Sequence, residues 1–164
     1  MLILMSDKFV FKKICSYLDE QKVIYRVLHH EPTLTSEDSA RIRKEDIRIG
    51  GKALLIKVGN TFRLFVLSAA LRLNSQAIRN HFRARKLRFA SAAELRDLTG
   101  LVPGSIPPFG EPILPFDLYV DSSITENKRI AFNAGSLTDS LFLDVEDYLR
   151  VARPAVFRFA ETVT

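Results

Sequence analysis

The sequence predicts an α/β domain built on a mixed or mostly antiparallel sheet, and it predicts one such domain over residues 1–164. A chain of this length is long enough to bury a substantial core. Hydrophobic residues make up 47% of the chain and charged residues 26%, as in ordinary globular proteins. Strand and helix patterns mix without the regular alternation of a doubly wound fold, and at least two hairpins are implied.

Hydrophobic periodicity and capping residues predict the elements in order. Gly59-Asn60 favours a tight turn between two strands, and Ser91-Ala92-Ala93-Glu94 is a capping box that begins a helix ending at Gly100. The predicted helices span residues 9–18 after a cap at Ser6, a short stretch through Arg43 capped by Thr35 or Ser36, 74–83 with Asn74 as the cap, 92–99, and a last helix from Asp144 that ends before Pro154. The predicted strands span residues 23–28, 52–58, 61–67, 87–90, 114–120, 129–133, 140–143 and 156–159.

The sequence lacks the characteristic motifs of several enzyme classes. It contains no G-x-G-x-x-G, no phosphate loop, no G-x-S-x-G elbow and no H-E-x-x-H. His29 and His30 are adjacent and would point to opposite faces of a strand, and together with His81 they give no zinc signature. If the site is catalytic, we expect it to work without a metal, a cofactor or a nucleophilic triad.

The charge balance mildly favours a polyanionic partner. Lys and Arg total 24 against 19 Asp and Glu, which gives a net charge of +5. Nucleic-acid phosphates would attract such a surface, although a solvated basic surface explains the excess as well. Two basic clusters stand out in the sequence: Arg79, Arg83, Arg85, Lys86 and Arg88, and then Arg41, Arg43, Lys44 and Arg48.

Cysteine use and hydropathy indicate a cytoplasmic protein. Cys15 is the only cysteine, so an internal disulfide is excluded and a reducing compartment is the natural expectation. Cys15 lies on the apolar face of the first predicted helix and is expected in the core. No apolar run approaches the length of a membrane span, so we expect no membrane partner.

Three groups of segments follow one another in an order that a known family shares. The first group is TSEDSAR at 35–41 with GGKALLIK at 50–57, the second is LRFASAAEL at 87–95 with TGLVPGSIPPFG at 99–110, and the third is VD at 120–121 with FNAGS at 132–136 and DVEDY at 144–148. In order and spacing these segments resemble the YbaK and prolyl-tRNA-synthetase-associated editing domain family. The resemblance covers nearly the whole chain.

This resemblance implies a curved mixed sheet surrounded by helices and an enzyme that hydrolyses the ester of mischarged aminoacyl-tRNA. Family members act in trans, several of them on tRNA for proline that carries alanine or cysteine. The resemblance also implies a functional lysine at the start of a central strand, matched by Lys52, and a glycine-containing loop, matched by Gly100 to Gly104. The ester is already activated, so an oriented water and donors to the developing oxyanion would suffice.

The resemblance assigns expected roles to individual residues. Lys52, Gly100 and Gly104 are the expected catalytic residues. Many relatives carry a histidine near the position of Leu137, so a less polar pocket for a small uncharged side chain is expected here. The other expected substrate contacts are Leu101, Val102, Pro103, Asn133, Gly135, Thr138, Asp139 and Ser140, and the expected tRNA contacts are Arg83, Arg85, Lys86 and Arg88.

Structural explanations compete with these roles. A lysine at a strand end also covers a core edge while its ammonium reaches water, and a loop rich in glycine and proline also serves as a rigid connection. Two other functions stay open, a non-catalytic tRNA- or nucleotide-binding module and a regulatory partner of an aminoacyl-tRNA synthetase. A synthetase is therefore a second expected partner beside the aminoacylated end of tRNA.

Overall fold

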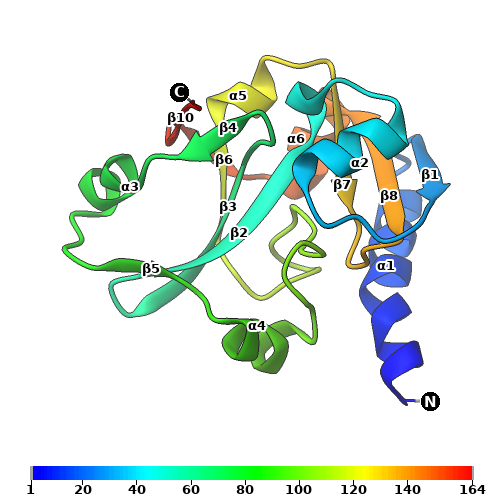
Figure 1. Ribbon diagram of the computed structural model, residues 1–164, viewed down its shortest axis with the longest axis horizontal. Helices are drawn as coiled ribbons and strands as arrows, with labels where there is room; N and C mark the ends of the chain where they lie inside the picture. The colour runs from blue at the N-terminus through cyan, green and yellow to red at the C-terminus, as the bar shows by residue number, and fades with distance from the viewer. Residues whose placement is uncertain (1, 164) are drawn as a thin grey trace.

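The fold is built around a long hairpin, β2 (Gly51–Val58) and β3 (Thr61–Ser68), which turns at Gly59-Asn60 (Figure 1). A computed structural model describes the backbone of residues 2–163 and the side chains of residues 8–163. Gly59 has a φ of 61°, a value that glycine adopts without a steric penalty. The hairpin therefore confirms both predicted strands and the turn between them.

The strands form a mixed and mostly antiparallel arrangement, as predicted. β3 pairs with β6 and β6 with β9 in parallel, whereas every other strand pair is antiparallel. A parallel bridge between Gly50 and Ala131 links the two larger sheets. The first sheet has the order β5 (Leu87–Phe89), β2, β3, β6 (Leu118–Asp121) and β9 (Ala155–Phe157); the second has the order β1 (Tyr25–His29), β8 (Asp139–Asp144) and β7 (Arg129–Asn133); β10 (Ala160–Thr162) pairs with β4 (Leu71–Leu73).

Capping residues determine where most of the helices begin. The side chains of Thr35, Asn74 and Ser91 each accept a hydrogen bond from a backbone N–H in the first turn of the helix that follows, and Gly100 ends a helix with a φ of 75°. These caps are the predicted ones. The helices are α1 (Leu2–Glu20), α2 (Ser36–Arg43), the 3₁₀ turn η1 (Ile47–Ile49), α3 (Ser75–Phe82), α4 (Ala92–Thr99), α5 (Ser122–Thr125) and α6 (Val145–Ala152).

Some predicted boundaries are wrong. Helix α1 begins at Leu2, so Ser6 lies inside it and is not its cap. The strand predicted over 114–120 starts only at Leu118, because the N–H of Leu114 turns back to the Gly110 carbonyl and Pro115 has no N–H to donate. Of the strand predicted over 156–159, only Val156 and Phe157 belong to a strand, β9, and β10 begins after it at Ala160. The elements β4, α5 and η1 were not predicted, since each is too short to show a period.

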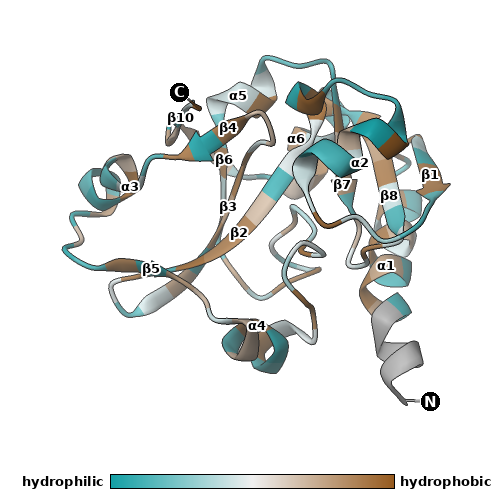
Figure 2. Cartoon of the chain, in the orientation of Figure 1, coloured by the Kyte–Doolittle hydropathy of each residue, from teal (hydrophilic) through white to brown (hydrophobic). Residues whose placement is uncertain are grey.

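Two hydrophobic layers cover the opposite faces of the central hairpin. Leu55, Leu64 and Val66 face a layer that also contains residues of α1, β7, β8 and α6. Ile56, Phe65 and the other β2 and β3 side chains that point to the opposite face contact a smaller layer under α3. Both layers share the strands β2 and β3. Figure 2 shows the result in colour, with β8 largely hydrophobic and α2 largely hydrophilic.

A buried aspartate holds the C-terminal strands against the central sheet. Asp121 is 2% exposed, and its carboxylate accepts hydrogen bonds from the backbone N–H groups of Phe159 (2.6 Å), Ala160 (2.8 Å) and Ser123 (2.9 Å). These bonds satisfy donors in the bend between β9 and β10 and in the first turn of α5. Asp121 therefore explains why the predicted final strand is interrupted.

We predict that Asp121→Ala will destabilise the protein strongly, because it leaves buried N–H groups without acceptors. The expected loss is about 3 kcal/mol in the free energy of unfolding, measured by urea denaturation. Asp121→Asn is the matched control: it keeps the shape and one acceptor oxygen, so its loss should be clearly smaller. Equal stability of the alanine variant and the wild type would contradict this role.

Candidate functional site

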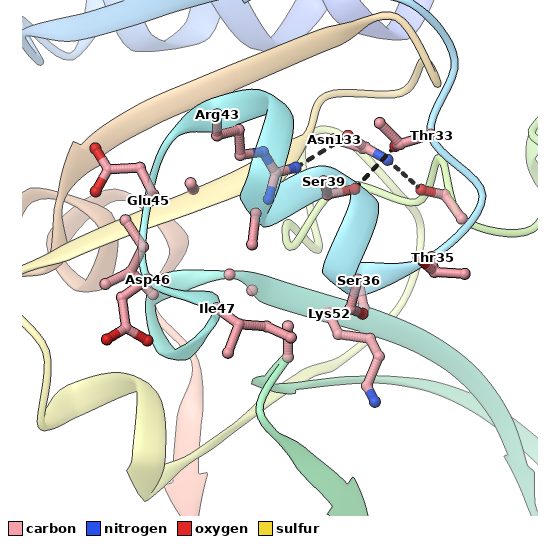
Figure 3. Close-up of a pocket in the computed structure, with 18 of the residues that line it drawn as sticks. Thr33, Thr35, Ser36, Ser39, Arg43, Glu45, Asp46, Ile47, Lys52 and Asn133 are labelled. Atoms are coloured by element: carbon pink, nitrogen blue, oxygen red, sulfur yellow. Dashed lines mark hydrogen bonds between the residues drawn. The ribbon is translucent and has the colours of Figure 1, made fainter.

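The candidate site is a pocket of about 240 Å³ between α2, the start of β2, the end of β7 and the segment around Gly104. Figure 3 shows Ser36, Ser39 and Arg43 on α2 and Lys52 on the neighbouring strand β2. The residues that line the pocket come from segments that lie far apart in the sequence. The polar and charged side chains in its lining belong to Thr33, Thr35, Ser36, Ser39, Arg43, Glu45, Asp46, Lys52 and Asn133.

Helix α2 supplies the inner wall. Its N-terminus is held by Thr35, whose side chain accepts a hydrogen bond from the N–H of Asp38 at 3.0 Å. Ser39 and Arg43 are spaced by four residues, so they lie on one helix face, and both are buried. The Ser39 hydroxyl donates to the Thr33 hydroxyl at 2.8 Å. The inner end of the pocket is therefore lined by polar groups.

Arg43 is a buried cation without a carboxylate partner among the side chains that the structure describes. Its Nε donates to the Ser140 hydroxyl at 2.9 Å and its Nη2 donates to Oδ1 of Asn133 at 3.0 Å. Burial lowers the pKa of Arg43 to about 10, so the guanidinium stays charged at neutral pH. The second basic cluster predicted from the sequence thus does not form one solvated surface.

The two nearby carboxylates are paired with other arginines. Glu45 forms an ion pair with Arg129 at 3.0 Å and lies 3.8 Å from Arg26. Asp46 pairs with Arg48 at 2.8 Å. The Arg43 guanidinium is therefore stabilised by neutral hydrogen-bond acceptors, and it retains its positive charge for whatever enters the pocket.

Asn133 connects Arg43 to the glycine-containing loop. While its Oδ1 accepts from Arg43, its Nδ2 donates to the Gly104 carbonyl at 2.8 Å. This pairing fixes which way the carboxamide points, because only the oxygen can accept from a guanidinium. Gly104 has a φ of 87°, and its N–H donates to no other residue in the described part of the chain. That N–H is free to bind a ligand.

Lys52, the second residue of β2, lines the opposite side of the pocket. Its Nζ donates to the Leu71 carbonyl at 3.1 Å, and the residue is half-buried. Burial lowers the pKa of Lys52, while the charge of Glu37 acts in the opposite direction. Lys52 shares a face of β2 with Leu54 and Ile56, as the sequence pattern predicted.

Ser140 and His30 are hydrogen-bonded like a catalytic nucleophile and its base, but a substrate cannot reach the Ser140 hydroxyl. Nε2 of His30 lies 2.8 Å from the Ser140 hydroxyl, and Nδ1 lies 2.8 Å from the Glu31 carbonyl. Ser140 is completely buried and is not among the residues that line the pocket. A substrate carbonyl could not reach its oxygen, so this pair supports Arg43 and does not form a catalytic dyad.

Asp139 anchors the first helix. Its carboxylate is completely buried and is bonded to Lys8 of α1, His29 of β1, and the hydroxyls of Ser136 (2.6 Å) and Thr138 (3.1 Å). Burial acts to raise the pKa of Asp139, but these hydrogen bonds outweigh it and lower the pKa to about 2. Asp139 and Thr138 therefore hold α1 against β8 and do not line the pocket.

Most of the residues predicted in the glycine-containing loop lie behind the pocket or beside it. Leu101 is part of the core, Gly100 ends α4, and Val102 is exposed. Gly135 packs against α1 so closely that a Cβ there would lie 2.7 Å from a methyl of Val10. Of the predicted catalytic and substrate-binding residues, the pocket is lined by Lys52, Gly104 and Asn133 and not by Gly100, Leu101, Val102, Pro103, Gly135, Leu137, Thr138, Asp139 or Ser140.

The residues predicted to contact tRNA lie at the far end of the central hairpin. A second hollow, of about 450 Å³, is lined there by Arg85, Lys86 and Arg88 together with Lys57 and Arg79. Arg83 is exposed at the C-terminal end of α3, just outside that hollow. Arg88 also pairs with Glu94 at 2.7 Å, which neutralises part of its charge. The remaining cations have no carboxylate in the lining.

Sequence reasoning missed the inner wall of the pocket. Thr33, Ser39 and Arg43 were not assigned to the site, although the spacing of Ser39 and Arg43 in a helix capped by Thr35 was visible in the sequence. The described side chains contain no group of three or more His, Cys, Asp or Glu placed to hold a metal ion. Among the described residues, no helix has the length and apolar character needed to cross a membrane.

Comparisons with known proteins agree on one family. The sequence model of the aminoacyl-tRNA editing domain matches residues 30–151. The multifunctional Ser/Thr-tRNA deacylase ProXp-y of Escherichia coli (strain K12) is 34% identical over 157 residues, which cover 92% of this chain and 93% of that protein. The prolyl-tRNA editing protein ProX of Acetoanaerobium sticklandii is 22% identical over 145 residues, covering 85% of this chain and 88% of that one.

The fold is shared with a solved structure as well. The crystal structure of a candidate trans-editing enzyme for prolyl tRNA synthetase superposes with a TM-score of 0.79 at 20% identity, over 92% of this chain and 96% of the other. A likeness at this identity speaks for the fold. Together with the match over residues 30–151, it shows that this chain belongs to the aminoacyl-tRNA editing domain family.

Proposed function

We propose that this protein is a trans-acting deacylase that hydrolyses the ester between a small, uncharged amino acid and a mischarged tRNA. The observation that carries the proposal is the meeting of Lys52, Gly104 and Asn133 at one pocket, since these residues come from three distant segments. The name of the Escherichia coli relative supports serine and threonine as the first acyl groups to test.

The pocket offers what an activated ester needs. The unoccupied N–H of Gly104 is a donor for the oxyanion that develops on the ester carbonyl. The Lys52 ammonium would bind the phosphate or ribose next to the ester and hold it in position. A water attacks the carbonyl carbon, and the vicinal ribose hydroxyl of the substrate relays the proton to the leaving oxygen. No nucleophilic side chain is required.

The pocket suits a small acyl group. Its volume of about 240 Å³ has room for a short side chain together with the ester. Leu137, expected to make the pocket less polar, lies beside Gly104, where a Cβ on the glycine would be 3.4 Å from Cδ2 of Leu137. The inner wall is formed by Thr33, Ser39 and Arg43 and is polar.

The basic hollow is the proposed docking site for the acceptor stem. Lys52 and Lys57 are five residues apart on β2, so they are about 16 Å apart along the strand and point to opposite faces of it. The backbone of a tRNA acceptor end spans such a distance within a few nucleotides. An association with a synthetase and a location in the cytoplasm are further parts of the proposal.

A panel of mischarged tRNAs tests the proposed function directly. The purified protein is incubated with one tRNA for proline that carries serine, threonine, alanine or a large charged amino acid, and released amino acid is measured. We expect release of the small uncharged residues. Binding of tRNA without any release would overturn the proposal in favour of a binding module.

We predict that Lys52→Ala will abolish most of the activity and leave the fold intact. Lys52 is half-buried at a strand start, so its removal opens no large core cavity. Loss of a positioned cation should reduce the rate by roughly a hundredfold, or about 3 kcal/mol in activation free energy. Single-turnover deacylation and thermal melting measure the two effects.

Lys128→Ala is the control for Lys52→Ala, because Lys128 is exposed and lies outside both hollows. Lys52→Arg should also be impaired, since a planar guanidinium does not fit the place of a compact ammonium. A wild-type rate for Lys52→Ala on every responsive tRNA would remove Lys52 from the mechanism.

We predict that replacing Arg83, Arg85 and Lys86 by glutamine will weaken the binding of all tRNAs to a similar extent. Phosphate contacts carry no sequence information, and each lost contact should reduce the slope of log K against log salt concentration by roughly 0.7–0.9. The matched control replaces Lys12 and Lys13 of α1 and Lys22, which follows α1, and all three are exposed. Unchanged tRNA affinity of the glutamine variant would show that these cations form only a solvated surface and do not contact tRNA.

A further inference from the structure

The inner end of the pocket contains an unused hydrogen-bond donor. Two of the three nitrogens of the Arg43 guanidinium are bonded, Nε to Ser140 and Nη2 to Asn133. The third, Nη1, has no hydrogen-bond partner among the described residues and lies in the wall of the pocket beside Gly50. Arg43 itself is only 9% exposed, so what reaches it must enter the pocket deeply.

We propose that Arg43 is a specificity-determining residue that binds the hydroxyl of a seryl or threonyl group through Nη1. The inference rests on the proposed deacylase function and adds the residue that recognises the acyl side chain. Ser140 and Asn133 hold the guanidinium in one orientation, so Nη1 is directed into the pocket without a further loss of side-chain entropy on binding.

The position of Arg43 decides which part of the substrate it meets. The α-ammonium of the amino acid is repelled by a cation, and the terminal phosphate lies on the RNA backbone, outside a pocket of about 240 Å³. The ester carbonyl belongs at the rim, near Gly104 and Lys52. The amino-acid side chain is the group that extends inward, toward Arg43, Ser39 and Thr33 (Figure 3).

The chemistry at this end suits a hydroxyl. A hydroxyl oxygen accepts from the guanidinium, and a hydrogen bond to a charged donor is stronger than one between neutral groups. An alkyl group of the same shape gives Nη1 nothing to bind and removes water from a buried charge. The pocket should therefore distinguish a hydroxyl from a methyl group of almost the same size.

The first test uses the wild-type protein and matched acyl groups on one tRNA body. Threonyl is compared with valyl, and seryl with 2-aminobutyryl, since each pair differs mainly by a hydroxyl in place of a methyl. We expect kcat/KM to be roughly tenfold to a hundredfold higher for the hydroxylated member of each pair. Equal values within both pairs would overturn the inference.

The second test changes Arg43. Arg43→Met keeps an apolar stem of similar length and should reduce the seryl to 2-aminobutyryl ratio of kcat/KM to near one, with the 2-aminobutyryl ester still hydrolysed. The matched control is Arg41→Met on the same helix, because Arg41 is exposed and pairs with Asp38. It should leave the ratio unchanged. An equal loss on both esters would overturn the inference, because the guanidinium would then bind a group common to both.

The two tests separate this inference from the proposed function. If Arg43→Met does not fold, the wild-type comparison still decides, because it needs no variant. Hydrolysis of all four small acyl groups at equal rates would overturn the role of Arg43 and leave the deacylase function in place. No release of any amino acid from any of the four esters would overturn both.

Discussion

The burial of one guanidinium constrains the arrangement of the pocket. A charge removed from water without a carboxylate beside it must be surrounded by hydrogen-bond acceptors, or the fold would be destabilised by several kcal/mol. Arg43 meets this requirement through Ser140 on β8 and Asn133 on β7. Helix α2 is thereby fixed against the second sheet, and Asn133 in turn fixes the Gly104 carbonyl.

The sequence predicted those elements whose boundaries depend on local chemistry. Thr35, Asn74, Ser91 and Gly100 act as the caps that their residue types suggested, and Gly59 turns the central hairpin. Boundaries that depend on tertiary contacts could not be predicted. The break between β9 and β10 depends on the carboxylate of Asp121, which is nearly forty residues away in the sequence.

The same distinction between local signals and tertiary contacts applies to the residues of the candidate site. Lys52 and Gly104 were expected at the site because the family resemblance pointed to a lysine at a strand start and to a glycine-containing loop, and both line the pocket. Arg43 was grouped with a second basic cluster because charge alone does not tell which cation of a run is buried, and only its spacing from Ser39 on one helix face indicated burial. Asp139 was assigned to the pocket although it fixes α1, because its partners Lys8 and His29 lie far from it in sequence.

The common strand between the two hollows has a mechanical consequence. Strand β2 pairs with β3 along its whole length, from Gly51 to Val58, and with β5 at Ile56–Val58, so one continuous paired strand joins Lys52 to Lys57. If RNA binds at one end of this strand and its ester at the other, as we propose, the two sites cannot move apart to release the RNA. The deacylated RNA must leave as a whole. Turnover would then depend on how weakly the phosphates are held, and a moderate excess of positive charge serves such an enzyme better than a large one.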